Sequence, residues 1–236
     1  MYHFETKYGL DQTLSPDHIM LIDHSTRQGK HWYTTITAEE FKNQQEKGLF
    51  NPTYNKFPTT FNYSGEGIDL TDNEIKIMCA VICDGTFNYN LTENANTLKK
   101  CRFHIKKDRK KEALRKLFTE SNIWWEEKIS SVNGYSDFYI IAPRKEKTFN
   151  PYWYNCNSHQ LQVICDNILQ WDGYTNITKK EKTRKGFSTT IKETADFIQF
   201  AFTSCGYRSY IRIDDRRGSK HIVNNKEYEH KSICYE

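Results

Sequence analysis

Two aspartates stand out because each ends an apolar stretch and each is followed by glycine. Asp84 follows "IMCAVIC" and Asp172 follows "CDNILQW", and the two lie 88 residues apart (172 − 84). A carboxylate at a helix C-terminus faces the negative end of the helix dipole, which costs about 0.3–1 kcal/mol unless a cation compensates. The pair therefore predicts a Mg²⁺ site built from both aspartates and the last helical carbonyls, those of Cys83 and Trp171. The alternative is that each aspartate simply ends a helix in an Asp-Gly turn.

The residues in front of the two aspartates predict helices that are buried on nearly all sides. Thr71 and Glu74 have the spacing of a capping box, which bonds free N–H groups of the first helical turn. Residues 75–83 are apolar except at one position and leave almost no polar face, and Gly85 would stop this helix. Asn157 or Ser158 would begin the second helix, and Gln160 has the capping-box spacing from Asn157. Buried helices in equivalent places would pack together and bring their terminal aspartates to one site.

Similar segments follow each Asp-Gly pair in the same order, which indicates a duplication. Each pair precedes a strand-like hairpin, a helix and a second hairpin. The pattern predicts an α+β fold with two α-β-β-α-β-β units, residues 67–152 and 153–236, related by a pseudo-twofold axis.

Start and stop signals set the expected bounds of the elements within the two units. In the first unit, a helix should run over residues 108–121, and the second hairpin should turn at Asn133-Gly134. In the second unit, Thr190 and Glu193 have capping-box spacing at the start of a helix. The final hairpin should pair residues 207–214 with residues 227–236.

Basic residues are concentrated in the later part of the chain. Residues 1–75 carry 6 Lys/Arg and 11 Asp/Glu, so residues 76–236 carry 28 (34 − 6) and 19 (30 − 11), a net charge of +9. Residues 99–116 alone hold ten Lys/Arg and two acids, which favours a polyanionic partner. Within this run, residues 101–106 alternate between apolar and basic, which is typical of a half-buried strand with a basic outer face. A solvated helix face is the alternative interpretation.

The two apolar segments also resemble a known family motif. "IMCAVICDG" (77–85) resembles the LAGLIDADG motif of homing endonucleases, and "CDNILQWDG" (165–173) resembles a more divergent second copy. The resemblance covers residues 68–236, and residues 195–211 also resemble a segment of intein-borne members. Two copies match the monomeric, pseudo-symmetric members, and this implies two four-stranded sheets that form a saddle over DNA.

The resemblance implies a Mg²⁺-dependent endonuclease that acts as a monomer on a long double-stranded DNA site. Asp84 and Asp172 would hold the metal, and a basic residue in each half would assist the attacking water. The nominated residues are Lys145 and Lys147, 61 and 63 residues after the first aspartate, and Lys231, 59 residues after the second. Side chains on the exposed sheet faces would contact DNA. The candidates are Arg102, His104, Lys106, Lys107, Lys179, Lys182, Ser188, Thr190, Arg208 and Arg212.

Residues 1–66 carry a separate resemblance, to the middle of a Hint (intein-splicing) domain. It rests on residues 14–24 and 31–41 and implies a small, mostly β segment in which Ser15 and His18 would activate a splice junction. The junction residues that splicing in cis requires are missing from this sequence. We therefore expect either an interior portion of an intein or a free-standing endonuclease that retains part of the splicing fold. An ordinary turn histidine at position 18 is the alternative.

Composition narrows the classes of protein to which this chain could belong. With 27% charged residues and no apolar run near the roughly 18 residues of a membrane helix, we expect no membrane partner. Seven scattered cysteines are typical of reduced thiols, and we expect a cytoplasmic location in a bacterial or phage-infected cell. Three alternatives stay open: a LAGLIDADG-like nucleic-acid-binding protein that does not cut (a maturase or regulator), a protein-splicing element, and a basic structural protein.

Overall fold

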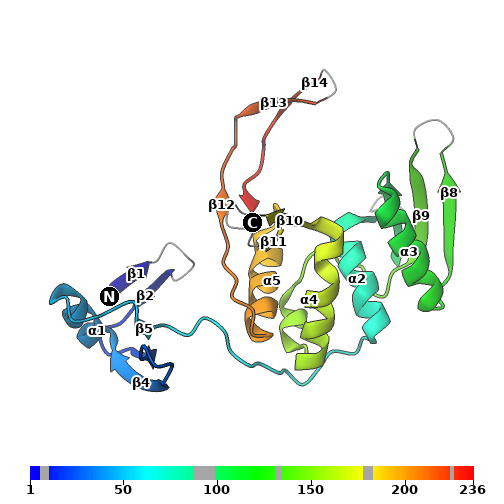
Figure 1. Ribbon diagram of the computed structural model, residues 1–236. Helices are drawn as coiled ribbons and strands as arrows, with labels where there is room; N and C mark the ends of the chain where they lie inside the picture. The colour runs from blue at the N-terminus through cyan, green and yellow to red at the C-terminus, as the bar shows by residue number, and fades with distance from the viewer. Residues whose placement is uncertain (6–10, 88–98, 131–133, 178–182, 224–225) are drawn as a thin grey trace. The chain divides into compact units, whose positions relative to one another are not determined.

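The chain forms two compact units of mixed α and β structure in the computed structural model (Figure 1). The described residues are 1–5, 11–87, 99–130, 134–177, 183–223 and 226–236. The smaller unit comprises Met1–Phe61 and Gly206–Tyr210, and the larger comprises Asn62–Cys205 and Ile211–Glu236. No helix in these described ranges combines the length and apolarity needed to cross a bilayer. The finer division of the larger unit at residues 152/153 stays a prediction.

The smaller unit consists of short antiparallel strands and one helix. Strand β1 (Tyr2–Glu5) pairs with β2 (Asp11–Leu14), and β3 (Ile19–Ser25) lies between β4 (His31–Thr37) and β5 (Asn55–Lys56). Thr37 forms a complete capping box at the start of α1 (Ala38–Glu46), which fixes where this helix begins. The alternation of β3 points one side of the sheet into a small core. That core contains Phe4, Met20, Ile22, Ala38 and Phe41.

The two candidate splicing residues lie in the turn between β2 and β3. The backbone N–H of His18 donates to the carbonyl oxygen of Ser15 at 3.1 Å, and the His18 side chain is exposed. A hydrogen bond over three residues is an ordinary turn contact. The Hint-like interpretation of residues 1–66 stays a prediction.

The larger unit begins with a helix, a four-stranded antiparallel sheet and a covering helix. Helix α2 (Asp72–Asp84) leads into β6 (Gly85–Phe87) and β7 (Lys100–Ile105), then α3 (Asp108–Glu120), β8 (Trp125–Ile129) and β9 (Ser136–Ile141). The strand order is β6-β7-β9-β8. Phe103 on the buried side of β7 contacts Phe118 of α3, so α3 covers that side of the sheet. The predicted capping box at Thr71, the helix that starts at Asp108 and the β8–β9 hairpin are confirmed.

The second part of the larger unit has shorter and more broken strands. After the short 3₁₀ helix η2 (Pro151–Asn155) come α4 (Ser158–Asp172), β10 (Gly173–Ile177), β11 (Thr183–Phe187), α5 (Lys192–Ser204), β12 (Ile213–Asp214), β13 (Lys220–Val223), β14 (Lys226–Glu229) and β15 (Cys234–Tyr235). The strands form three two-stranded ladders, β10-β11, β12-β15 and β13-β14. An isolated bridge between Thr189 and Tyr235 joins the end of β11 to β15. Through this bridge, two residues beyond β11, the separate ladders β10-β11 and β12-β15 adjoin in the order β10-β11-β15-β12.

Two local predictions in this part need correction. The final hairpin pairs over a shorter span than residues 207–214 with 227–236. Ile213 and Asp214 pair with Tyr235 and Cys234, and Arg212 and Glu236 exchange two backbone hydrogen bonds (2.6 and 2.9 Å). Residues 207–211 form no strand, because residues 227–229 pair with β13 instead. The predicted capping box at Thr190 does not form either. Helix α5 begins at Lys192 after Ile191, which caps it with no side-chain bond, because the bridge at Thr189 keeps the preceding chain extended.

Helices α2 and α4 pack side by side in the core of the larger unit (Figure 1). Each continues directly into a strand through its terminal glycine. Gly85 ends α2 as expected, and both Gly85 (φ −76°, ψ 157°) and Gly173 (φ −84°, ψ 156°) are extended. Glycine is needed at both positions because a side chain would clash with neighbouring atoms. A Cβ would lie 2.6 Å from the Cys101 sulfur at Gly85 and 2.1 Å from the Leu169 carbonyl oxygen at Gly173.

Gly173→Ala is therefore expected to destabilise the larger unit by at least about 2 kcal/mol, because the new methyl group overlaps backbone that cannot rotate away. The free energy of unfolding in urea measures the effect. Thr175→Ala, an exposed position on β10, is the control and should change stability by less than about 0.5 kcal/mol. Equal unfolding midpoints for Gly173→Ala and the unmodified protein would contradict the steric explanation.

Candidate metal and nucleic-acid site

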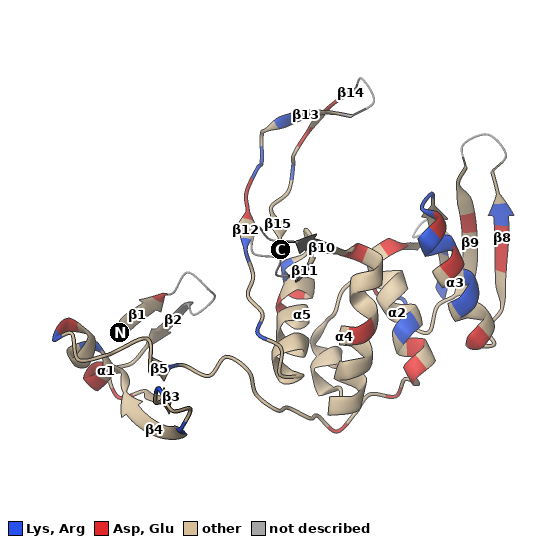
Figure 2. Ribbon diagram, viewed as in Figure 1, with Lys and Arg blue, Asp and Glu red and all other residues tan. Residues whose placement is uncertain are grey.

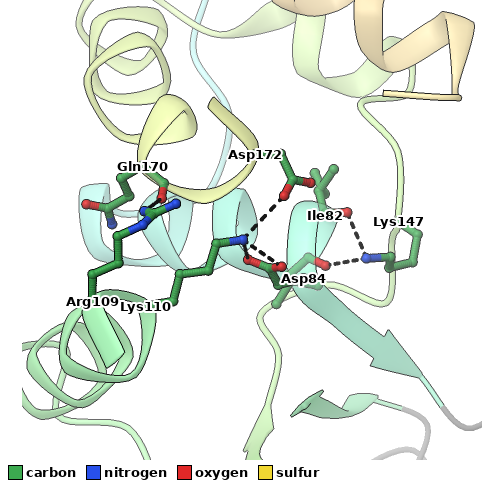
Figure 3. A network of polar contacts seen from close by, with 8 residues as sticks. Ile82, Asp84, Arg109, Lys110, Lys147, Gln170 and Asp172 are labelled. Atoms are coloured by element: carbon green, nitrogen blue, oxygen red, sulfur yellow. Dashed lines mark hydrogen bonds and ion pairs between the residues drawn. The ribbon is translucent and has the colours of Figure 1, made fainter. Parts of the chain in front are cut away.

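The C-terminal ends of α2 and α4 bring Asp84 and Asp172 to one place (Figure 3). The Nζ atom of Lys110, in the first turn of α3, lies 2.6 and 2.9 Å from the two carboxylate oxygens of Asp84. The same atom lies 3.4 Å from Oδ1 of Asp172. One ammonium group thus contacts both carboxylates. The two aspartates meet around a cation that belongs to the protein.

The packing of α3 holds Lys110 in this position. Its side chain is only 8% exposed. The buried residues of α3 are Lys110, Leu114, Leu117 and Phe118, a spacing that forms one helix face. Arg109 donates to the carbonyl oxygen of Gln170 at 2.6 Å and so ties the start of α3 to the end of α4. Because residues 99–116 are rich in basic residues, composition does not distinguish Lys110 from its neighbours. Its position on the apolar face of the helix is the sequence signal that could have identified it as a buried lysine.

Lys147 lies at the other side of the α2 C-terminus and caps the helix. Its Nζ donates to the carbonyl oxygens of Val81 and Ile82, both at 2.7 Å (Figure 3). A cation at a helix C-terminus is stabilised by the helix dipole and by the free carbonyls there. Burial lowers the pKa of the Lys147 ammonium, and the charges of nearby groups, Asp84 and Asp172 among them, partly oppose that shift.

Lys147→Met should lower the free energy of unfolding by about 1.5–3 kcal/mol, because two charge-assisted hydrogen bonds to helix-end carbonyls are lost while the alkyl chain is kept. Urea unfolding measures the effect. The matched control is Lys116→Met, whose side chain is 75% exposed and forms an i,i+4 pair with Glu120. Such pairs contribute about 0.3–0.5 kcal/mol, so equal losses in the two variants would contradict the capping role.

A cleft of about 370 Å³ opens beside these helix ends. Asp172 and Lys147 line it together, with Ile82, Cys83, Phe187, Ser188, Thr189, Thr190, Ile191, Thr194 and Cys234. Burial, reinforced by the charge of Asp172, raises the pKa of the Cys83 thiol, which keeps it neutral and a poor metal ligand. The Thr194 hydroxyl is buried with no hydrogen-bond partner among the described residues. The cleft therefore offers a carboxylate, an ammonium group and hydroxyls to an entering polar group.

The donors around the aspartates fit a hard divalent cation that keeps most of its water. Carboxylate oxygens are the ligands that Mg²⁺ prefers. In the part of the chain that the structure describes, no cluster of three or more His, Cys, Asp or Glu residues could hold a metal. The nominated carbonyls of Cys83 and Trp171 directly precede the two aspartates on their helices. An ion at this place would bind Asp84 and Asp172 and keep several water ligands, in the space where Lys110 now contacts both carboxylates.

The outer face of the first sheet is less basic than the alternating pattern predicts. Arg102 and His104 are exposed on β7, but both bind Asp137 on β9. Burial acts to raise the pKa of the Asp137 carboxyl, and the hydrogen bonds from Arg102 and His104 outweigh it and hold that pKa below its usual range. Two predicted DNA contacts thus already have an acidic partner across the strand.

Other cations of this face lie beside tyrosine rings. The Nζ atom of Lys106 lies 5.6 Å from the ring centre of Tyr135, and that of Lys100 lies 5.5 Å from Tyr139. Figure 2 shows that lysine and arginine also gather on α3, which covers the opposite side of the sheet. Lys100 and Lys106 are therefore the cations on the outer face that carry no carboxylate partner among the contacts of the described residues.

The remaining predicted DNA contacts lie in different surroundings. Ser188 and Thr190 line the cleft beside Asp172, so they lie close to the aspartates. Lys107 is exposed directly before α3, and Arg212 pairs with the carboxylate of Glu236. Arg208 is exposed in the segment grouped with the smaller unit. Lys179 and Lys182 lie outside the described residues.

Of the three nominated catalytic lysines, the structure places Lys147 in the cleft with Asp172. Lys145 is half-buried two residues earlier, and Lys231 is exposed between β14 and β15. Neither is part of the cleft lining among the described residues. Similar offsets from the two aspartates therefore lead to different surroundings.

Comparison with known proteins gives similarities in structure but none in sequence. No protein-family model matches the sequence, and no curated protein matches it. Among solved structures, the crystal structure of the N-terminal LAGLIDADG domain of DUF199/WhiA is similar to this chain, with a TM-score of 0.43 and 10% sequence identity. The similarity covers 70% of this chain and 75% of that chain. A likeness of this degree supports no statement about function.

Proposed function

We propose that this chain is a LAGLIDADG-type endonuclease that cuts both strands of a specific DNA site with Mg²⁺. The observation that carries the proposal is the meeting of Asp84 and Asp172 at the ends of two paired helices. Carboxylates at two helix C-termini are unfavourable by about 0.3–1 kcal/mol each unless they share a cation. The convergence of both carboxylates at one place is an arrangement that a bound divalent cation would stabilise.

The order of the strands supports the duplication on which this proposal depends. The first half has the order β6-β7-β9-β8, and the second has β10-β11-β15-β12 through the bridge at Thr189. In both, the last strand of the half lies between its second and third strands. The β13–β14 hairpin is an extension between β12 and β15. We therefore interpret residues 67–152 and 153–236 as pseudo-symmetric halves of a monomer.

Each part of the site has a role in this proposal. Asp84 and Asp172 would hold Mg²⁺, which when bound activates a water and stabilises the leaving oxygen. Lys147, in the cleft beside Asp172, would attract and orient a phosphate group. The outer sheet face would position the duplex through phosphate contacts and read base edges in the major groove.

The proposal is tested by incubating the protein with a randomised double-stranded DNA library and Mg²⁺ and sequencing the cut ends. We expect ends that recur at one sequence, with one cut on each strand and short 3′ overhangs, and no cutting in EDTA. A library that stays uncut at all Mg²⁺ concentrations, or one cut equally well in EDTA, would contradict it.

A specific observation favours a second candidate, a nucleic-acid-binding protein that does not cut. Lys110 already pairs with both carboxylates, so each has a cationic partner with no metal. In that case the library would yield bound sequences but no cut ends. The selection of one bound sequence from the same uncut library identifies this alternative.

A further inference from the structure

The ammonium group of Lys110 lies where a shared metal ion would bind. Its three contacts are with both oxygens of Asp84 and one oxygen of Asp172, and an ammonium group has three N–H donors. We infer that Lys110 is a built-in counter-ion that competes with the divalent cation for these carboxylates. The inference rests on the metal site of the proposed function and adds a residue that regulates its occupancy.

Distances make the competition unavoidable. Mg²⁺ binds carboxylate oxygens at about 2.0–2.1 Å. Nζ lies 2.6 and 2.9 Å from the Asp84 oxygens, so an ion between the carboxylates would overlap it. The ion and the ammonium group also repel each other strongly at such separations, because the site has a low effective dielectric constant. Lys110 must move away from at least one carboxylate before an ion can bind both.

Burial explains why the protein keeps a cation there. The side chains of Lys110 and Asp84 are 8% and 18% exposed. Removing one partner of a buried ion pair leaves an uncompensated charge. Without Lys110, two carboxylates would face each other at the seam of α2 and α4. Lys110 therefore stabilises the metal-free helix pair and lowers the affinity of the same place for metal.

The test measures Mn²⁺ binding by electron paramagnetic resonance on the full chain without DNA, so it does not depend on activity. Lys110→Met keeps the alkyl chain and removes the charge, and we expect its Kd for Mn²⁺ to fall at least about tenfold. Lys110→Gln should change the Kd in the same direction. Lys116→Met, an exposed lysine of the same helix, should bind like the unmodified protein. Adding Asp84→Asn to Lys110→Met should remove the gain.

A second readout follows from linkage. A ligand that binds only the folded state raises its stability, so Mn²⁺ should raise the Tm of Lys110→Met more than that of the unmodified protein. If a folded Lys110→Met binds Mn²⁺ with the original Kd, the inference is wrong. If that variant does not fold even with Mn²⁺, the Kd of Lys110→Gln decides by the same criterion.

The outcome separates this inference from the endonuclease proposal. A gain in Mn²⁺ affinity without any DNA cutting supports the competition and contradicts the endonuclease. Asp84-dependent cutting together with an unchanged Kd in Lys110→Met supports the endonuclease and contradicts the competition.

Discussion

Asp84→Asn is expected to reduce Mg²⁺-dependent cleavage at least about 10³-fold, a loss of about 4 kcal/mol of transition-state stabilisation. Asparagine keeps the size of the side chain and one oxygen but removes the charge that binds the ion. The Asp84 carboxylate bonds to Lys110 of α3, and the exposed β7 residues Arg102 and His104 bond to Asp137 instead, so DNA affinity in Ca²⁺ should change less than about threefold. Single-turnover cleavage and filter binding measure the two quantities.

Asp166→Asn is the matched control for this substitution. Asp166 is exposed on α4, accepts a hydrogen bond from Gln162 at 2.8 Å and does not take part in the Lys110 contacts. The Asp166→Asn variant should cut DNA at the rate of the unmodified protein. If Asp84→Asn also cuts at that rate, the assignment of the metal to the two aspartates is wrong. If Asp84→Asn loses DNA binding instead, then DNA binding by the sheet and cleavage at the helix ends do not depend on separate residues.

Local patterns predict the fold well where they concern neighbours in sequence. The capping boxes at Thr71 and Asn157 satisfy the first turns of α2 and α4, and alternation along β7 places Phe103 inside and Arg102 outside. The predicted start or end of an element is wrong where a contact with a residue distant in sequence determines it. The bridge between Thr189 and Tyr235 delays the start of α5, and no local pattern encodes that pairing.

The same distinction holds for the candidate site. Two similar helices that end on aspartate are visible in sequence, and their packing places Asp84 beside Asp172. Lys110 and Asp137 reach their partners from other elements, 26 and 35 residues from Asp84 and Arg102. From the charge count alone, Lys110 is expected on the surface and Arg102 is expected to have no acidic partner. Packing buries Lys110, which only its place in the apolar stripe of α3 indicates in the sequence, and it pairs Arg102 with Asp137, which only three-dimensional contacts show.

DNA affinity should fall about 10³-fold between 50 and 200 mM salt if six or more phosphates are contacted, because each contact releases condensed counterions. The measurement is the slope of log K against log salt concentration, taken in Ca²⁺ to prevent cutting. A slope near zero would show that the exposed cations of the sheet do not bind the DNA backbone.

Single substitutions separate the contributions to that slope. Lys100→Gln should lower its magnitude by about 0.9, because Lys100 lies beside Tyr139 on the outer face and its charge is available to a phosphate. Arg102→Gln should lower it less, since its guanidinium group already bonds both oxygens of Asp137 at 2.9 and 2.8 Å. Lys116→Gln, on the helix that covers the other side of the sheet, should leave the slope unchanged. Equal effects of all three would mean that DNA senses only net charge and that the sheet has no binding face.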